Sequence, residues 1–167
     1  DWSRGLGDVY KRQALYSPGH AKHHYTFYDE FSGTVFMGDT LGLIYPHGSF
    51  VQPNLPPPDF DQEILFETLN KIEKLNLNQL AIAHFGIHKN PYELIRNAKE
   101  SINNWIEFID KLPNRTDKEA SDELVNWIIT NYKSLGIDEG TINNYIGNGN
   151  FEMQINGVRR FLNNKKL

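Results

Sequence analysis

The chain of 167 residues contains no cysteine. This absence excludes disulfide scaffolds, thiolate zinc sites, iron–sulfur clusters and cysteine nucleophiles. The sequence also lacks an apolar run near the ~18 residues that a membrane-spanning helix needs. It has no excess of positive charge, because 17 Lys and Arg stand against 21 Asp and Glu. We therefore expect no membrane span and no nucleic-acid partner, and any metal must be held by His, Asp or Glu.

The ligands that remain for a metal are concentrated in one part of the chain. All six histidines lie between His20 and His88. Hydrophobic residues make up 39% of the sequence, which is enough to build the core of one ordinary domain.

Residues 1–13 differ from the rest of the chain. They contain no Asn and no Ile, although the remainder is rich in both, and they hold two of the six arginines. We interpret them as a non-native leader, similar to translated adapter sequence, with a disordered native leader as the alternative. Folded structure is expected from Ala14.

The apolar pattern predicts an α/β layered body followed by helices. A β-hairpin is expected over 24–29 and 34–37, and the proline-rich segment 41–58 is expected to be a surface loop. A helix with Asp59 or Asp61 as N-cap and a short strand then follow at 61–75 and 79–83. Further helices are expected to begin at Asn90, at a Thr116 capping box and near Glu152.

Three potential metal ligands each follow a short apolar run. His20, Asp39 and His84 come after Ala-Leu-Tyr, Thr-Val-Phe-Met and Leu-Ala-Ile-Ala. Residues at the same end of neighbouring strands can converge on one point. Turns containing Gly19 and Gly38 are expected to expose the first two side chains. Each of the three donors suits zinc.

These residues lie in stretches that resemble the metallo-β-lactamase superfamily. Residues 17–24 (SPGHAKHH) and 32–39 (SGTVFMGD) are similar to its middle motifs, and residues 83–86 (AHFG) to its final ligand motif. Residues 57–61 resemble a branch near glyoxalase II and lactonase-like enzymes. The resemblance covers 14–112, the expected C-terminal part of the domain, and is weaker over the helical extension 113–167.

The resemblance implies the C-terminal half of an αββα sandwich that binds two zinc ions. His20 would complete the histidines of the first metal, Asp39 would bridge both metals as the catalytic carboxylate, and His84 would bind the second. The implied activity is hydrolysis of a small-molecule ester, thioester or lactone by a bridging hydroxide. A cytoplasmic protein is expected.

The sequence departs from the family in one respect. The first ligand motif, His-x-His-x-Asp-His, does not occur. We therefore interpret the chain as a fragment that alone binds zinc weakly and has negligible activity. Truncation would expose a sheet face and favour a homodimer or aggregation. The alternatives are a one-iron enzyme similar to persulfide dioxygenases and a non-catalytic binding module.

The other polar candidates have less specific signals. His24 matches a second histidine of the motif and would either support the metal ligands through hydrogen bonds or have a purely structural role. His88, if it lies in a loop, and Tyr45 are candidates for substrate contact. His23 is expected to be exposed on the opposite hairpin face, and His47 to be solvated.

Overall fold

The computed structural model describes residues 12–45, 50–84 and 86–166. Within these ranges the chain forms a five-stranded sheet, ordered β1-β2-β3-β4-β5, and five helices. The strands are β1 (Arg12–Tyr16), β2 (Tyr25–Asp29), β3 (Thr34–Gly38), β4 (Gln79–Ile82) and β5 (Gly86–His88). The helices are α2 (Gln62–Ile72), α3 (Pro91–Asp110), α4 (Asp117–Ser134), α5 (Glu139–Gly147) and α6 (Phe151–Lys165).

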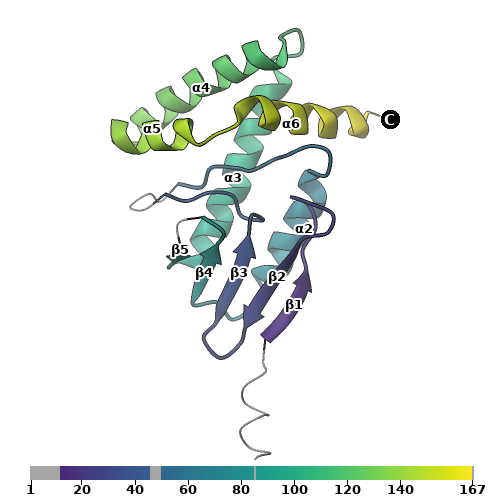
Figure 1. Cartoon of the computed structure of the whole chain (residues 1–167), viewed down its shortest axis with the longest axis vertical. Coiled ribbons are helices and arrows are strands. Elements are labelled where there is room, and N and C mark those ends of the chain that lie inside the picture. The colour runs from purple at the N-terminus through teal and green to yellow at the C-terminus, as the bar shows by residue number, and fades with distance from the viewer. Residues whose placement is uncertain (1–11, 46–49, 85, 167) are drawn as a thin grey trace, which may run out of the picture.

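The strand directions bring three strand ends to one edge of the sheet. β1 and β2 pair antiparallel, as do β2 and β3, while β3 and β4 pair parallel. Therefore β1, β3 and β4 run in the same direction, and their C-terminal ends point toward α4, α5 and α6 (Figure 1). The predicted hairpin is confirmed as β2 and β3.

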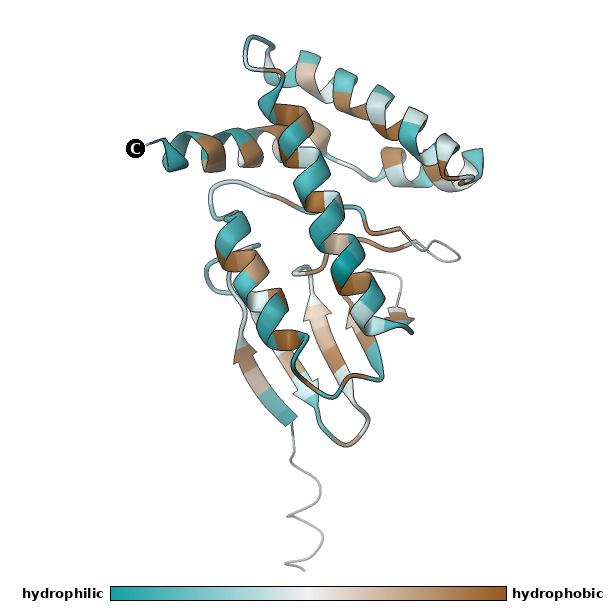
Figure 2. Ribbon diagram, turned by 180° about the vertical axis from the view of Figure 1, so that it is seen from behind, coloured by the Kyte–Doolittle hydropathy of each residue, from teal (hydrophilic) through white to brown (hydrophobic). Residues whose placement is uncertain are grey.

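One face of the sheet is covered by α2 and α3, whose apolar sides turn toward the strands (Figure 2). Alternate residues of the strands are buried beneath them: Tyr28, Val35, Met37, Leu80 and Ile82. The three C-terminal helices lie beyond the strand ends and pack mainly on one another and on α3 (Figure 1). The predicted α/β body with a helical C-terminal part is confirmed, and no helix of the described residues is both long and apolar enough to cross a membrane.

The prediction of a surface loop over 41–58 is wrong for its described residues. Ile44, Val51 and Leu55 are fully buried, and Leu43 pairs with Gln52 in an isolated β-bridge. The segment runs between the strand ends and α6. Its prolines end regular structure, but tertiary packing places its apolar residues in the core.

The close fit of this segment to α6 depends on Gly157. A Cβ at this position would overlap the carbonyl oxygen of Leu55. The Leu55 amide also donates to the side chain of Gln154, which lies on α6 like Gly157. A glycine at 157 therefore allows α6 to contact the chain that leads away from the strand ends.

Several helix ends agree with the sequence and several do not. Asp61 caps α2 by accepting from the Ile64 amide at 3.1 Å, and Thr116 with Glu119 forms the predicted capping box. Asn90 precedes α3 but its side chain makes no cap hydrogen bond. The helix α5 was not predicted, and β1 begins at Arg12, two residues before the expected start of structure. Residues 1–11 lie outside the described residues.

Candidate metal centre

Two of the predicted ligands meet where the parallel strands β3 and β4 end. Asp39 Oδ1 lies 3.5 Å from His84 Nε2, and both side chains are partly exposed. The backbone joins the two turns, because the Ala83 amide donates to the Gly38 carbonyl at 3.0 Å. The register between the strands also shifts between Phe36 and Gly38, an irregularity that changes where a strand end directs its side chains.

His24 contacts Asp39 through the main chain. Its Nε2 accepts from the Asp39 amide at 3.4 Å, and its Nδ1 lies 2.9 Å from Thr40 Oγ1. Since Nε2 is an acceptor, Nδ1 carries the proton and donates to the hydroxyl. Burial lowers the pKa of His24, as does the neighbouring His20, while Asp39 acts in the opposite direction. His24 is thus a neutral side chain that holds the Asp39 backbone.

Gly38 makes room for this histidine. Its φ of +55° is in the left-handed region, and a Cβ there would lie 2.5 Å from His24 Nε2. Any other residue would be strained and would displace the imidazole.

His20 is buried rather than exposed, with 9% of its surface accessible. Its Nδ1 lies 3.0 Å from the Asn54 carbonyl oxygen. A carbonyl can only accept, so Nδ1 donates, and in the neutral imidazole Nε2 then keeps the lone pair with which histidine binds a metal. The His20 ring packs edge-on against His24, with 6.0 Å between ring centres. His24 therefore adjoins both His20 and Asp39.

The donor set fits a metal in chemistry but not in number. Asp39 and His84 form an adjoining pair, and His20 is held in a ligand-competent form. Over residues 12–45, 50–84 and 86–166, however, no three or more His, Asp or Glu side chains form a group that could hold a metal ion. Among these residues His20 therefore does not join Asp39 and His84 in one three-ligand group, and the assignment of the three side chains to two metals stays a prediction.

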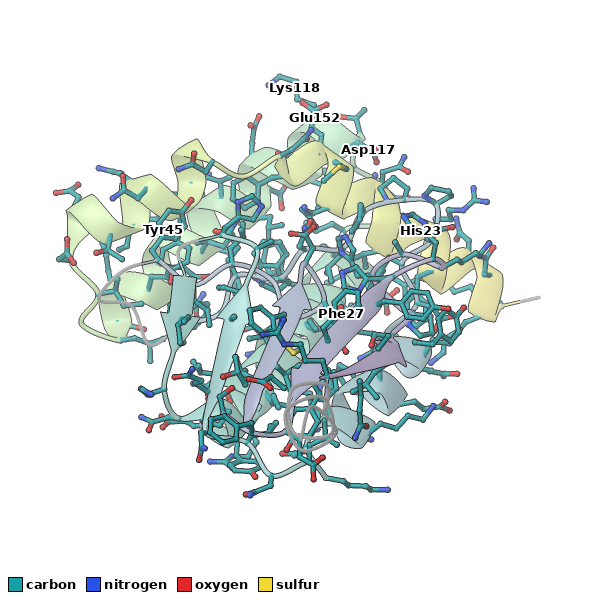
Figure 3. The ribbon with its side chains drawn as sticks, turned by 60° about the horizontal axis from the view of Figure 1, so that its bottom comes forward. His23, Phe27, Tyr45, Asp117, Lys118 and Glu152 are labelled. Carbon is teal, nitrogen blue, oxygen red and sulfur yellow. The ribbon has the colours of Figure 1, made fainter. Side chains whose placement is uncertain are left out.

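Tyr45 lines the same cavity as His84, next to the strand ends. It is buried, and its ring packs against Tyr145 with 4.3 Å between centres. Burial raises the pKa of Tyr45, and a hydrogen bond with the Asn148 side chain acts against that shift. In Figure 3 it lies below the C-terminal helices, across the strand ends from His23.

Two of the remaining histidines, His88 and His23, do not belong to the pair formed by Asp39 and His84. His88 belongs to β5 and pairs with Leu80, so the loop expected to carry it is a strand. That strand leads back along β4, away from the end that carries His84. His23 is exposed, as predicted. His47 lies outside the described residues.

Sequence reasoning missed the carboxamide side chains around the centre. The Asn54 backbone carbonyl accepts from His20 Nδ1, and the Asn54 side chain accepts from Gln154 Nε2 through Oδ1 at 3.3 Å. These two residues are 100 positions apart, and carboxamides have no spacing that marks a site. No signal in the sequence could have paired them.

The chain is similar to known proteins in its fold, but it matches no family model and no curated protein in sequence. A solved metallo-beta-lactamase family protein of Thermus thermophilus matches with a TM-score of 0.64 at 18% identity, over 93% of this chain and 44% of that one. An archaeal metallo-beta-lactamase superfamily protein of Sulfolobus tokodaii has a TM-score of 0.48 at 22% identity, over 89% and 45%.

The Thermus structure establishes the fold of this chain as that of a metallo-beta-lactamase family protein. The chain spans less than half the length of that structure. The α/β fold predicted from the sequence is confirmed.

Proposed function

We propose that this chain is part of a metallo-β-lactamase-fold hydrolase, and that it contributes His20, Asp39 and His84 to a dinuclear zinc centre. The observation that carries the proposal is the 3.5 Å approach of Asp39 Oδ1 to His84 Nε2 at the common end of two parallel strands. A carboxylate beside an imidazole is a donor pair that zinc accepts. Two bound zinc ions would supply a hydroxide near neutral pH and polarise the carbonyl of an ester, thioester or lactone.

The chain's own residues would prepare the donors for this task. His24 stays neutral and holds the Asp39 amide, which positions the backbone that carries the carboxylate. The Asn54 carbonyl keeps the proton of His20 on Nδ1 and leaves Nε2 free to bind. Neither interaction requires a metal to form.

The other ligands would come from a preceding segment of a longer protein. The chain covers 44% of the Thermus structure, which leaves room for such a segment. The superfamily resemblance assigns it the motif His-x-His-x-Asp-His. We therefore propose that the chain is a fragment of this longer protein.

Calorimetric titration with zinc tests the proposal. We expect weak binding by this chain alone, and binding of two zinc ions once the preceding segment is restored. His84→Asn and Asp39→Asn should abolish the weak binding. His23→Asn, which changes an exposed histidine outside the pair, is the matched control and should leave it unchanged.

Three results would contradict the proposal. A tight two-zinc site in this chain alone would show that no ligands are missing. One iron per restored protein would favour the persulfide dioxygenase alternative. A preceding segment without the ligand motif would favour a binding module.

A further inference from the structure

Two Asn-Gly pairs occur in the C-terminal part of the chain, Asn148-Gly149 and Asn156-Gly157, and no other asparagine precedes a glycine. An asparagine before glycine is prone to spontaneous deamidation, because glycine has no side chain to hinder attack by its backbone nitrogen on the neighbouring carboxamide. The two pairs have the same chemistry but different surroundings. Any difference in their reactivity therefore comes from the structure.

Packing requires the glycine of each pair. A Cβ at Gly149 would overlap the ring of Phe151, and a Cβ at Gly157 would overlap the carbonyl oxygen of Leu55. Phe151 and Leu55 are both buried, so neither has free space into which it could move. The fit of α6 to its neighbours thus keeps both Asn-Gly pairs in the chain.

The pair Asn156-Gly157 is protected by α6. It lies inside this helix, where each backbone N–H donates to the carbonyl four residues earlier, and Gly157 is buried. The Asn156 side chain donates to Asp117 Oδ2 at 3.3 Å. Deamidation needs the glycine nitrogen to leave its hydrogen bond and turn toward the asparagine side chain. At this position α6 would have to unfold locally before the reaction could begin.

The pair Asn148-Gly149 lies in the turn between α5 and α6, and Asn148 is exposed (Figure 1). Besides a hydrogen bond between the Asn148 and Tyr45 side chains, two contacts hold the turn. The Gly149 amide donates to the Ile146 carbonyl at 3.1 Å, and Asn148 Nδ2 donates to the Asn144 carbonyl at 2.9 Å. Both acceptors belong to the end of a nine-residue helix, and the ends of short helices open at a low cost in free energy. Such an opening frees both reacting groups and leaves α6 intact.

We propose that Asn148 is a site of spontaneous deamidation, in which water converts it to aspartate or isoaspartate, whereas Asn156 stays intact in the folded chain. The Gly149 nitrogen forms a bond to Asn148 Cγ, the bond from Cγ to Nδ2 breaks, and ammonia leaves with the proton of the Gly149 amide. Water then opens the resulting five-membered ring at one of its two carbonyl carbons. The reaction is independent of the proposed hydrolase function.

The modification changes how α5 ends. The new carboxylate cannot donate a hydrogen bond to the Asn144 carbonyl. It also lies at the C-terminus of the helix, which is the negative end of the helix dipole and disfavours an anion. Isoaspartate in addition inserts one extra carbon into the backbone of the turn. The proposal therefore includes easier opening of α5 once Asn148 has reacted.

The test incubates the full chain at mildly alkaline pH and follows deamidation by peptide mass spectrometry. Cleavage after Glu139 and Glu152 places the two Asn-Gly pairs in different peptides. We expect Asn148 to react at least about tenfold faster than Asn156 in the folded chain, because only the turn opens at low cost. In concentrated urea both should react at similar rates, since α6 no longer protects Asn156.

Variants separate the reaction from its effect on α5. Asn148→Gln keeps a carboxamide but cannot form the five-membered ring, so the modification at this position should be lost. Asn148→Asp reproduces the charge and should speed amide hydrogen exchange in α5 by about fivefold. Asn143→Asp is the matched control, because it adds the same charge to the same helix but leaves the Asn148 side chain in place. Its effect on exchange should be smaller.

Three results would overturn the proposal: equal rates at Asn148 and Asn156 in the folded chain, no reaction at Asn148, or unchanged hydrogen exchange of α5 in Asn148→Asp. None of these measurements uses a metal or a substrate. Failure of the zinc titration would therefore reject the hydrolase and leave the deamidation site standing. The opposite combination of results would reject the deamidation site alone.

Discussion

The two faces of the sheet have similar apolar side chains but opposite surroundings. On one face, residues such as Val35 and Leu80 are fully buried under α2 and α3. On the other, large side chains remain between 47% and 60% exposed: Tyr16, Tyr25, Phe27, Phe36 and Ile87. Figure 3 looks onto this second face, with Phe27 in front of the strands.

The exposed side chains are arranged across the strands. Phe27 is opposite Phe36, Phe36 is opposite Ala81, and Ala81 is opposite Ile87. A sheet that faces water on one side normally alternates apolar and polar residues along each strand. In this sheet the row of residues just described is apolar on the open face, and its neighbours on the covered face are apolar as well. Such strands are suited to a sheet packed on both faces, which supports the predicted sandwich.

The largest expected effect comes from the covered face. Leu80→Ala should lower the free energy of unfolding by about 2 to 5 kcal/mol, because it leaves a cavity under the helices. Phe36→Ala, in the neighbouring strand but on the open face, should cost less than about 1 kcal/mol. Urea denaturation measures both. Equal losses would mean that the open face is packed in solution.

A smaller effect is expected on association through the open face. We expect the chain alone to self-associate there, because contiguous exposed apolar side chains favour burial. The double variant Phe27→Ser, Phe36→Ser should weaken association by roughly 2 kcal/mol. Analytical ultracentrifugation measures the shift. A monomeric unmodified chain that unfolds cooperatively would refute the expectation.

The smallest effect is a loss of stability at alkaline pH, caused by the buried tyrosines of the C-terminal helices. These tyrosines are shielded from water, unlike the aromatic side chains on the open face of the sheet. Burial raises the pKa of Tyr145 to about 12, against 10.0 for the ordinary side chain. The folded chain then keeps a proton that the unfolded chain loses. Stability is therefore complete below pH 10 and decreases by about 1 to 2 kcal/mol as the pH rises through 12.

Denaturation at several alkaline pH values measures this dependence. Tyr145→Phe should make it shallower, although the variant also loses the hydrogen bonds with Phe50 and Tyr45 at neutral pH. Burial raises the pKa of Tyr132 as well, so part of the dependence should remain. An unchanged slope would show that Tyr145 is not protected in the folded state.

Local signals in the sequence predicted most of the regular elements. The Thr116 capping box and the Asp61 cap were confirmed, because each involves residues close in sequence. The three residues of β5 and the Asn-rich α5 were missed, because neither carries a clear apolar period. The segment 41–58 was misread as surface, since its burial depends on contacts with α6, about 100 residues later.

The sequence by itself determined the strands β2, β3 and β4, the helix caps at Asp61 and Thr116, and the order of donor residues at the strand ends. These are set by side-chain alternation, by capping and by glycine, which act over a few residues. Only the tertiary structure decided that Asp39 meets His84, that His24 holds the Asp39 amide, and that His20 stays outside a three-ligand group. It also placed the carboxamides beside His84. These contacts join residues far apart in the chain, and they depend on strand direction and helix packing rather than on any local preference.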